Sequence, residues 1–321
     1  MFYVSEKAVE ATVNQPGVND AIEAIFKSLA AEDAVNFPVV RETLGYADAI
    51  FGFKSGFDRS GPTLGVKAGG LWPGNRAKGI ANHQSTIVLF DPETGGPHAL
   101  VRGTYLTALR TAAASALSIR ALARQDSSAL GIIGAGGQST FQVRAALAER
   151  SFKELYIFDA MAENAAQLKE SLSDTGLKIE VADAKAVAEA SDVLITVTPS
   201  FEPIIAKEWV KPGTHLACMG ADTKGKQEVE TGLVAEASLF GDEAAQAITL
   251  GECQHAFGAG LIKPEDITTL GLVLLGEHPG RSDDEEITLF DSTGIGLQDL
   301  AAAVFALKAA QASGDVVELE D

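Results

Sequence analysis

The chain has 321 residues, of which 46% are hydrophobic and 21% charged, so it is long enough for two packed cores and too apolar to be disordered. Its 25 basic and 44 acidic residues give a formal net charge of −19. Because this charge repels phosphate backbones and acidic membrane surfaces, the sequence argues against nucleic-acid and membrane partners.

The N-terminus has no basic start followed by an apolar core, and no apolar run is long enough to cross a bilayer. We therefore expect a cytoplasmic protein. The two cysteines, Cys218 and Cys253, cannot form a disulfide framework and are expected to be free thiols.

The first third of the chain predicts one helix followed by antiparallel strands. Residues 20–31 have helical apolar spacing, with Asp20 as the expected cap. From about 39 to 101, short apolar runs separated by glycine and proline predict strands joined by turns, with 91–96 as a hairpin connection. Residues 104–124, rich in alanine and leucine, predict a long and mostly buried helix.

Arg110 lies in the middle of that expected helix. The residues three and four positions away carry no carboxylate, so no neighbour on its own helix can neutralise it. A buried and unpaired cation costs several kcal/mol, so an anion must come from elsewhere. A structural Asp or Glu and a ligand carboxylate both remain open as that partner.

Around Arg110 the local charge is positive, unlike the chain as a whole. Residues 54–110 contain three acids, Asp58, Asp91 and Glu93, and seven cations: Lys54, Arg59, Lys67, Arg76, Lys78, Arg102 and Arg110. This net positive segment indicates either an anionic ligand or a chance surface patch.

The second half alternates apolar runs with Ala/Glu/Lys segments, which predicts a parallel, doubly wound sheet. The expected strands are 129–133, 155–159, 178–182, 193–197, 215–219, 238–241 and 287–291. A last alanine-rich helix, 296–312, could cross back to the N-terminal domain. The predicted fold is therefore α/β: a Rossmann domain at 119–301 and a discontinuous α+β domain at 1–118 and 302–321.

A glycine loop follows the first of these strands and opens a helix. Glycines at its key positions allow a tight turn and let a pyrophosphate approach the amides at the helix N-terminus. Alone, this GxGxxS pattern is weak, and a glycine turn without a nucleotide is the alternative. The residues expected to contact the dinucleotide are Gly134, Gly136, Gly137, Gln138 and Ser139.

Asp159 strengthens this interpretation because it stands 23 residues after Gly136 (159 − 136), at the end of the second expected strand. A carboxylate there accepts hydrogen bonds from ribose hydroxyls and repels a 2′-phosphate. The next residues, Ala160 and Met161, supply no cation. The expected cofactor is therefore NAD(H) rather than NADP(H).

Six segments together resemble the ornithine cyclodeaminase/mu-crystallin family over nearly the whole length. They are GVKAGG (65–70), TALRTAAASALS (107–118), GIIGAGGQS (131–139), the aspartate of YIFDA, MGADTKGKQEV (219–229) and DSTGIGLQD (291–299). The resemblance implies a first, antiparallel domain that binds substrate and builds a homodimer, and a second domain of the Rossmann type.

The resemblance also implies roles for single residues. It places Lys67 and Arg110 on a substrate carboxylate, and Asp222 beside the nicotinamide as the acid/base residue, with Lys67 as a second candidate catalytic group. Without the resemblance, Asp222 reads as a turn residue. The further cofactor contacts implied are Thr198, Met219, Lys226 and Ser292.

The surplus of cations suits a substrate with a second carboxylate better than a diamino acid. Our leading hypothesis is NADH-dependent reduction of a dicarboxylic imino acid, most concretely iminosuccinate to aspartate. The alternatives are an ornithine cyclodeaminase or alanine dehydrogenase-like activity, or a non-catalytic NAD(P)H-dependent ligand-binding protein. Candidate ligands for the second carboxylate, each also explicable as a surface or structural residue, are Arg41, Lys54, Arg76 and His83.

A metal site is a weaker possibility. His215 and Cys218 have HxxC spacing, and Cys253 with His255 gives CxH. Because the first pair lies within an expected strand whose side chains alternate between faces, we expect no metal.

Overall fold

A computed structural model, which describes residues 1–320, divides into two compact units. The first combines Met1–Ala113 with the chain from Ile295 onward, and the second is Ala114–Gly294. The observed divisions fall inside helix α3 (Thr104–Leu122) and just before helix α11 (Gly296–Ser313), whereas the sequence analysis placed them at 118/119 and 301/302. Helix α11 therefore belongs entirely to the first unit.

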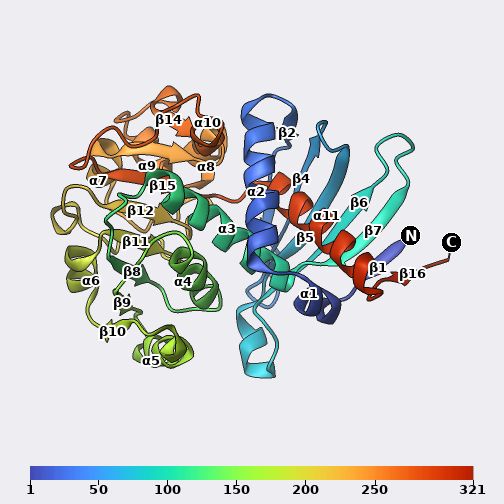
Figure 1. The fold of residues 1–321 in the computed structure, drawn as a ribbon, viewed down its shortest axis with the longest axis horizontal. Coiled ribbons are helices and arrows are strands. Elements are labelled where there is room, and N and C mark those ends of the chain that lie inside the picture. Colours follow the sequence, from blue (N-terminus) through green and yellow to red (C-terminus); the bar gives the residue numbers. More distant parts are fainter. Residues whose placement is uncertain (321) are drawn as a thin grey trace. The chain divides into compact units, whose positions relative to one another are not determined.

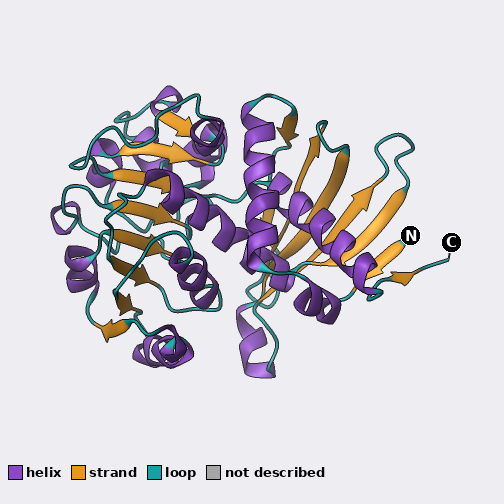
Figure 2. Cartoon of the chain, viewed as in Figure 1, coloured by secondary structure: helices purple, strands orange, loops and turns teal. Residues whose placement is uncertain are grey.

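The first unit is one mixed sheet with helices packed on it (Figures 1 and 2). Its strand order is β16-β1-β7-β6-β5-β4-β2, with β3 also paired to β4; β1 and β7 are parallel, and the other pairs are antiparallel. The strands are β1 (Phe2–Val4), β2 (Ala34–Asn36), β3 (Val40–Thr43), β4 (Ile50–Asp58), β5 (Thr63–Leu71), β6 (His83–Phe90), β7 (Pro97–Arg102) and β16 (Val317–Glu318). Its helices, besides α11 and the start of α3, are α1 (Glu6–Thr12), α2 (Gln15–Ala30) and the 3-10 turn η1 (Pro73–Lys78).

The beginning of α2 corrects one expectation. The helix starts at Gln15 rather than near residue 20, and its cap is Asn14, whose side chain accepts a hydrogen bond from the Gly17 amide at 2.9 Å. The predicted cap Asp20 lies inside the helix. The apolar spacing was nevertheless informative, because Ile22 and Phe26 are buried as a helical face requires.

One face of this sheet is buried beneath α11, which contacts β4, β5, β6 and β7 (Figure 1). Alternate residues of each strand point to that face, as the pleat dictates. Most of the buried positions are apolar, such as Ile87 and Leu89 on β6, but β4 and β5 each place a lysine there, Lys54 and Lys67. Two cations in an otherwise apolar layer require an anion nearby.

The second unit is an all-parallel sheet of eight strands in the order β10-β9-β8-β11-β12-β15-β13-β14. The strands are β8 (Ala129–Ile133), β9 (Glu154–Phe158), β10 (Lys178–Val181), β11 (Val193–Thr196), β12 (His215–Cys218), β13 (Ser238–Gly241), β14 (Ile267–Thr269) and β15 (Thr288–Asp291). The helices, besides the end of α3, are α4 (Ser139–Leu147), α5 (Ala162–Ser171), α6 (Ala184–Ala190), α7 (Thr231–Glu236), α8 (Ala244–Leu250), α9 (Gln254–Gly258) and α10 (Leu270–Leu275). Short 3-10 turns are η2 (Ser173–Thr175), η3 (Lys207–Trp209) and η4 (Pro264–Asp266).

All seven strands expected in this half are present, and each observed end differs from the expected one by at most one residue. Strand β14 was missed because its three residues are too short to show a period. The predicted α/β class with a Rossmann-type parallel sheet is confirmed. In this topology the order reverses between β8 and β11, and ligands of such sheets bind outside the carboxyl ends of the strands at that point.

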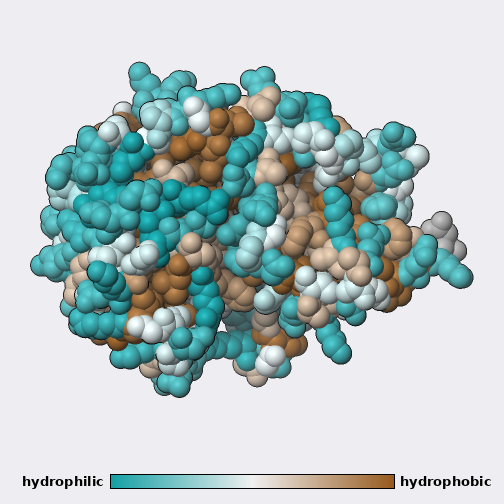
Figure 3. Space-filling model, in the orientation of Figure 1, coloured by the Kyte–Doolittle hydropathy of each residue, from teal (hydrophilic) through white to brown (hydrophobic). Residues whose placement is uncertain are grey.

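Hydrophilic side chains cover most of the viewed face of the second unit, with smaller apolar areas among them (Figure 3). This surface agrees with the large excess of acidic residues in the chain. Among the described residues, no helix is long and apolar enough to cross a membrane.

Candidate functional site

The glycine loop lies between β8 and α4, where the sequence predicted it. Gly134 has φ +100°, and a Cβ there would lie 2.7 Å from the Val197 carbonyl oxygen, so a side chain would be excluded on both counts. A Cβ on Gly136 or Gly137 would meet nothing within 4 Å. The loop is thus closed on the side of β11 and open in front of the α4 N-terminus, which is the geometry a pyrophosphate needs.

The last two loop residues differ in exposure. Gln138 is the N-cap residue of α4 and makes no side-chain cap. Ser139 is only 1% exposed, and its hydroxyl donates to the Gly136 carbonyl at 2.7 Å, so its small side chain serves loop packing. This agrees with the need for a small residue at the third position of the motif.

Asp159 follows β9 and is tied directly to the glycine loop. Its Oδ2 accepts a hydrogen bond from the Ala135 amide at 2.7 Å, while Oδ1 accepts from the Met161 amide at 2.8 Å. The carboxylate is therefore fixed beside the open part of the loop. The adjacent Met161 is 58% exposed, and no cation follows Asp159 to receive a 2′-phosphate.

The other expected cofactor contacts gather at the same edge of the sheet. Thr198, Met219 and Ser292 come just after β11, β12 and β15, which are neighbouring parallel strands in register. The main chain continues this alignment past the strands, because the Met219 amide donates to the Thr196 carbonyl at 2.7 Å. The carboxyl edge of the sheet thus brings these residues level with the glycine loop.

Asp222 and Lys226 form an ion pair in the loop between β12 and α7. Lys226 Nζ donates to Asp222 Oδ1 at 2.8 Å and to the Gly220 carbonyl at 3.2 Å, and the Thr223 hydroxyl donates to the same carboxylate oxygen at 3.1 Å. Both side chains keep some exposure, 27% for Asp222 and 17% for Lys226. The carboxyl group is therefore oriented by Lys226 and Thr223 and is still reachable from solvent.

In the first unit, the anion that pairs with Arg110 is Asp299 on α11. Arg110 Nε donates to Asp299 Oδ1 at 2.9 Å, and Lys67 Nζ lies 2.7 Å from Asp299 Oδ2. Arg110 also donates through Nη1 to Gln298 Oε1 at 3.0 Å. A structural aspartate therefore bridges the two cations that the family resemblance assigns to a substrate carboxylate.

Lys54 adds a third cation to this cluster. It lies directly opposite Lys67 in the β4–β5 register, so the two side chains stand on the same buried face. Like charges at directly opposed positions repel, and Asp299 is the anion that offsets them. We call Lys54, Lys67, Arg110 and Asp299 the charged cluster.

The remaining candidates for a second carboxylate differ in position. His83, on β6, is partly buried, and Lys67, Arg110 and Arg41 all act on its ionisation, so it faces the charged cluster. Arg41 lies on β3 and is half-buried, whereas Arg76 is exposed on η1. The structure thus gathers His83 and Arg41 near the cluster and leaves Arg76 in solvent.

Burial and mutual charge set the ionisation of the cluster. Burial, opposed by Asp299 and reinforced by Arg110 and Lys54, lowers the pKa of Lys67 to about 7. Burial also lowers the pKa of His83 to about 3, so its imidazole is neutral at physiological pH. For Asp299, burial raises the pKa, but Arg110 and Lys67 outweigh it and keep the pKa below its usual value.

The comparisons with known proteins agree with this architecture. The family model described as "Ornithine cyclodeaminase/mu-crystallin family" matches residues 5–314. This chain belongs to that family. It is 47% identical over 320 residues to the iminosuccinate reductase of Paracoccus denitrificans (strain Pd 1222), and the match covers 100% of both chains.

Two solved structures of the family are similar in fold as well. The crystal structure of the Paracoccus denitrificans iminosuccinate reductase in complex with NAD+ has a TM-score of 0.95 and covers 100% of this chain and 99% of that chain, at 47% identity. An archaeal alanine dehydrogenase dimer with bound NAD has a TM-score of 0.93 and 32% identity, with 100% of each chain covered.

Sequence reasoning missed two residues of this site: Asp299, a member of the charged cluster, and Gln298, which bonds Arg110. They were quoted in the family motif 291–299 but received no role. One signal was present: the expected helix over 296–312 is almost entirely apolar, and Asp299 is an acid within its first turn. Such an acid, fully buried, needs a cation, and Arg110 was the cation without a partner.

The possible metal ligands in the second unit have other partners. His215 contacts the Ser118 hydroxyl through Nε2 at 3.1 Å and the Thr288 hydroxyl through Nδ1 at 2.9 Å, and burial lowers its pKa to about 3. Cys218 and Cys253 are buried free thiols, and burial raises the pKa of both. Within residues 1–320, no three His, Cys, Asp or Glu side chains are arranged to hold a metal ion.

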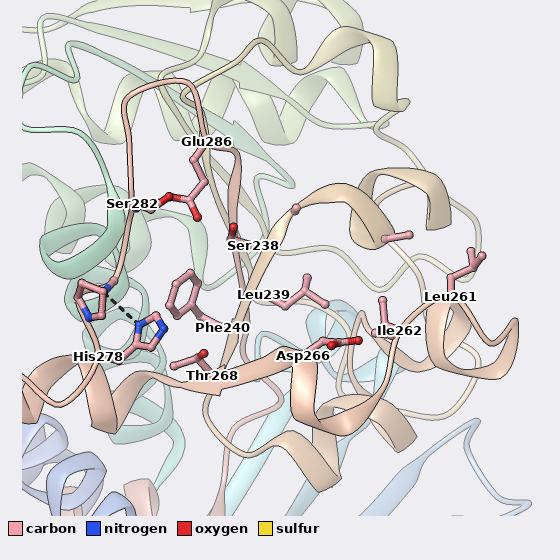
Figure 4. A pocket seen from close by; sticks show the side chains of 14 residues that line it. Ser238, Leu239, Phe240, Leu261, Ile262, Asp266, Thr268, His278, Ser282 and Glu286 are labelled. Carbon is pink, nitrogen blue, oxygen red and sulfur yellow. Dashed lines mark hydrogen bonds between the residues drawn. The ribbon is translucent and has the colours of Figure 1, made fainter.

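A cavity of about 470 Å³ lies elsewhere in the second unit and contains none of the predicted site residues. Its walls include Phe240 and His278, whose rings meet edge to face at 5.9 Å, and two carboxylates, Asp266 and Glu286. Figure 4 shows Glu286 beside Ser282 and Asp266 on the opposite side near Ile262. Both carboxylates are already hydrogen-bonded, to the Lys263 amide and to Ser282.

Proposed function

We propose that this chain is an NADH-dependent imine reductase that converts a small dicarboxylic imino acid, best represented by iminosuccinate, into the amino acid. The observation that carries the proposal is the charged cluster, in which Lys67 and Arg110 pair with Asp299 and the buried Lys54 also acts on its ionisation. The 47% identity to a full-length iminosuccinate reductase supports the same substrate class.

The charge balance of the cluster favours two carboxylates on the substrate. Within the cluster itself, the cations Lys54, Lys67 and Arg110 outnumber the one carboxylate, Asp299, and so form a surplus of positive charge. A dicarboxylate neutralises that surplus, whereas a diamino acid would add a cation to it. We assign Lys67 and Arg110 to the carboxylate beside the imine carbon, and Lys54 with His83 and Arg41 to the distal one.

NAD(H) fits the second unit. The open glycine loop at the start of α4 would hold the pyrophosphate, and Asp159 would accept hydrogen bonds from the adenosine ribose. Thr198, Met219 and Ser292, at the carboxyl ends of β11, β12 and β15, would border the nicotinamide. When bound, NADH supplies the hydride that reduces the imine carbon.

Asp222 is the proposed proton donor. Reduction of a C=N bond requires a hydride at carbon and a proton at nitrogen, and a carboxyl group beside the nitrogen can deliver that proton directly or through a water. Lys226 and Thr223 orient the carboxyl group. Lys67, with a pKa of about 7, is a second group able to exchange a proton near neutral pH.

The experiment is to follow NADH consumption with freshly generated iminosuccinate, with the imine of pyruvate and a Δ1-pyrroline carboxylate as comparators. Selective turnover of the four-carbon dicarboxylate, lost in Arg110→Ala and kept in Arg120→Ala, supports the proposal. Arg120 lies on the same helix but is exposed and paired with Glu149, so it is the matched control. Ammonia release from ornithine without net NADH consumption, or a change in NADH fluorescence with no consumption at all, contradicts it.

We further propose that the chain forms a homodimer through an apolar strip on the first unit. A second copy is the proposed occupant because an archaeal alanine dehydrogenase of the same fold is a dimer. Large apolar side chains that are exposed next to one another are typical of protein interfaces. The strip is formed by Val40 and Phe53, two exposed side chains that are register partners on β3 and β4.

Light scattering coupled to size exclusion tests the dimer. Phe53→Glu should give a monomer, whereas Val181→Glu should leave the mass unchanged. Both side chains are 43% exposed, but Val181 is in the second unit, outside the strip. A monomeric wild-type protein at micromolar concentration refutes the assignment.

We also propose a cytoplasmic location and a small carboxylate as the natural partner. The two buried free thiols and the excess of acidic residues are compatible with a reducing, aqueous compartment. Cell fractionation tests the location, and recovery in a membrane or secreted fraction contradicts it.

A further inference from the structure

A buried carboxylate, Glu228, joins the loops that follow β11 and β12. Its Oε1 accepts a hydrogen bond from the Thr198 amide at 2.6 Å. Its Oε2 accepts from the Thr196 hydroxyl at 2.8 Å and from the Gly220 amide at 2.8 Å. One side chain therefore bonds the segment that carries Thr198 and the segment that leads to Asp222.

The two loops are packed tightly at this point. A Cβ on Gly220 would lie 2.3 Å from the Thr198 carbonyl oxygen and 2.6 Å from Glu228 Cδ, so only glycine fits. On its other side, the Gly220 carbonyl accepts the hydrogen bond from Lys226, which also holds Asp222. A continuous series of bonds thus runs from Glu228 through Gly220 and Lys226 to Asp222.

A second buried carboxylate, Glu252, accepts hydrogen bonds from the main chain at Glu228 and the next residue. Glu252 Oε1 accepts from the Glu228 amide at 2.9 Å and from the Val229 amide at 2.8 Å. Gln254 extends this support, since its side chain accepts from the Gly225 amide and donates to the Lys226 carbonyl. The segment 252–254 therefore bonds the second half of the loop that bears Asp222, from Gly225 to Val229.

The ionisation of the two acids differs. Burial raises the pKa of both carboxyls, and the charge of Glu228 raises that of Glu252 further, to well above its usual value. Hydrogen bonds from Thr198, Thr196 and Gly220 oppose the rise at Glu228. The charged form is therefore disfavoured more strongly at Glu252 than at Glu228, whose two carboxyl oxygens accept hydrogen bonds from Thr198, Thr196 and Gly220.

We propose that Glu228 is a positioning residue that fixes Thr198 and the Asp222–Lys226 pair relative to each other, and so sets the geometry at the nicotinamide and at the proton donor. This inference rests on the proposed function for its catalytic consequence, but not for its effect on NADH binding. Glu228 itself is fully buried, and the groups that it bonds are the loop segments that carry Thr198 and Gly220.

The test compares Glu228→Gln with Glu252→Gln, two isosteric changes at neighbouring buried acids. In Glu228→Gln an NH2 group must face the Thr198 or the Gly220 amide, so donor meets donor and the loops must separate. We expect kcat to fall about 100-fold, as a misplacement of about 1 Å does. We also expect the Kd for NADH to rise and the KM for the imine to stay nearly constant, because the charged cluster is unchanged.

Glu252→Gln is expected to behave like wild type, because its amide oxygen can still accept from the Glu228 and Val229 amides. Thr196→Val, which removes one donor to Glu228, should give a smaller change of the same sign as Glu228→Gln. It also serves as the deciding variant if Glu228→Gln does not fold.

The readouts separate positioning from stability and from the proposed function. A destabilised but correctly arranged protein binds fewer NADH molecules per chain with an unchanged Kd, and that result overturns the inference. A wild-type kcat and Kd in folded Glu228→Gln, or in Thr196→Val when the first variant is unfolded, overturns it too. If the wild type reduces no imine, the proposed function fails, while a raised NADH Kd in Glu228→Gln still upholds the positioning role.

Discussion

The ionisation of Lys67 makes substrate binding depend on pH in a specific way. In the free protein its pKa is about 7, because burial and the neighbouring cations Arg110 and Lys54 disfavour its charged form. A bound dicarboxylate adds negative charge beside it and raises that pKa. Binding therefore takes up a proton, and affinity is highest below pH 7 and falls as the pH rises through it.

The size of the effect follows from the pKa. The protonated fraction of Lys67 falls from about nine-tenths at pH 6 to about one-eleventh at pH 8, so the Kd of a dicarboxylate rises about tenfold, or ~1.4 kcal/mol. Succinate is a suitable ligand because it has both carboxylates and no reactive imine. We would titrate it calorimetrically into the NAD+-loaded protein across this range, in two buffers of different ionisation enthalpy.

Lys67→Arg is the matched variant, since arginine stays protonated throughout the range. It should retain binding and lose most of the pH dependence, whereas Lys67→Gln should bind weakly at every pH. A wild-type Kd that is constant from pH 6 to 8, with no proton uptake, would refute the assignment of Lys67 to the substrate.

Three further substitutions test the two units separately. Asp299→Asn removes the anion shared by Lys67 and Arg110, and we expect urea unfolding to give a free energy of unfolding lower by about 3–5 kcal/mol. Asp222→Asn should lower kcat by about 10²–10⁴-fold in steady-state assays, because it loses the proton donor, with little change in the Kd for NADH. Asp159→Ala should weaken NADH about tenfold in fluorescence titrations and reduce the preference over NADPH, because it removes both the ribose acceptor and the repulsion of a 2′-phosphate.

Each substitution has a contrary outcome. Asp174→Asn breaks an exposed pair with Arg144 and should cost no more than about 1 kcal/mol, so an Asp299→Asn protein of equal stability contradicts the buried-cluster argument. An unchanged kcat in Asp222→Asn removes Asp222 from the mechanism. An Asp159→Ala protein with the wild-type cofactor preference shows that another residue selects the cofactor.

The sequence alone determined those features whose residues are close together in the chain. Alternating apolar runs predicted the strands of the second unit, and the glycine loop between β8 and α4 was recognised with its helix. Asp159 was placed by its distance from Gly136. These inferences succeeded because turn geometry, helix initiation and strand burial depend on residues a few positions apart.

Only the tertiary structure decided which distant groups meet. Arg110 and Asp299 are separated by 189 positions. The sequence suggested that the last helix crosses back to the first unit, but no local pattern placed its single acid above two lysines. The pairing of Lys54 with Lys67 depends on the β4–β5 register, in which a shift of one residue would move Lys54 to the other face. Glu228 joins two loops only because β11 and β12 are adjacent. Pairing, register and the energetics of buried charge are properties of the packed chain, so the sequence could name the cations but not the anion that holds them.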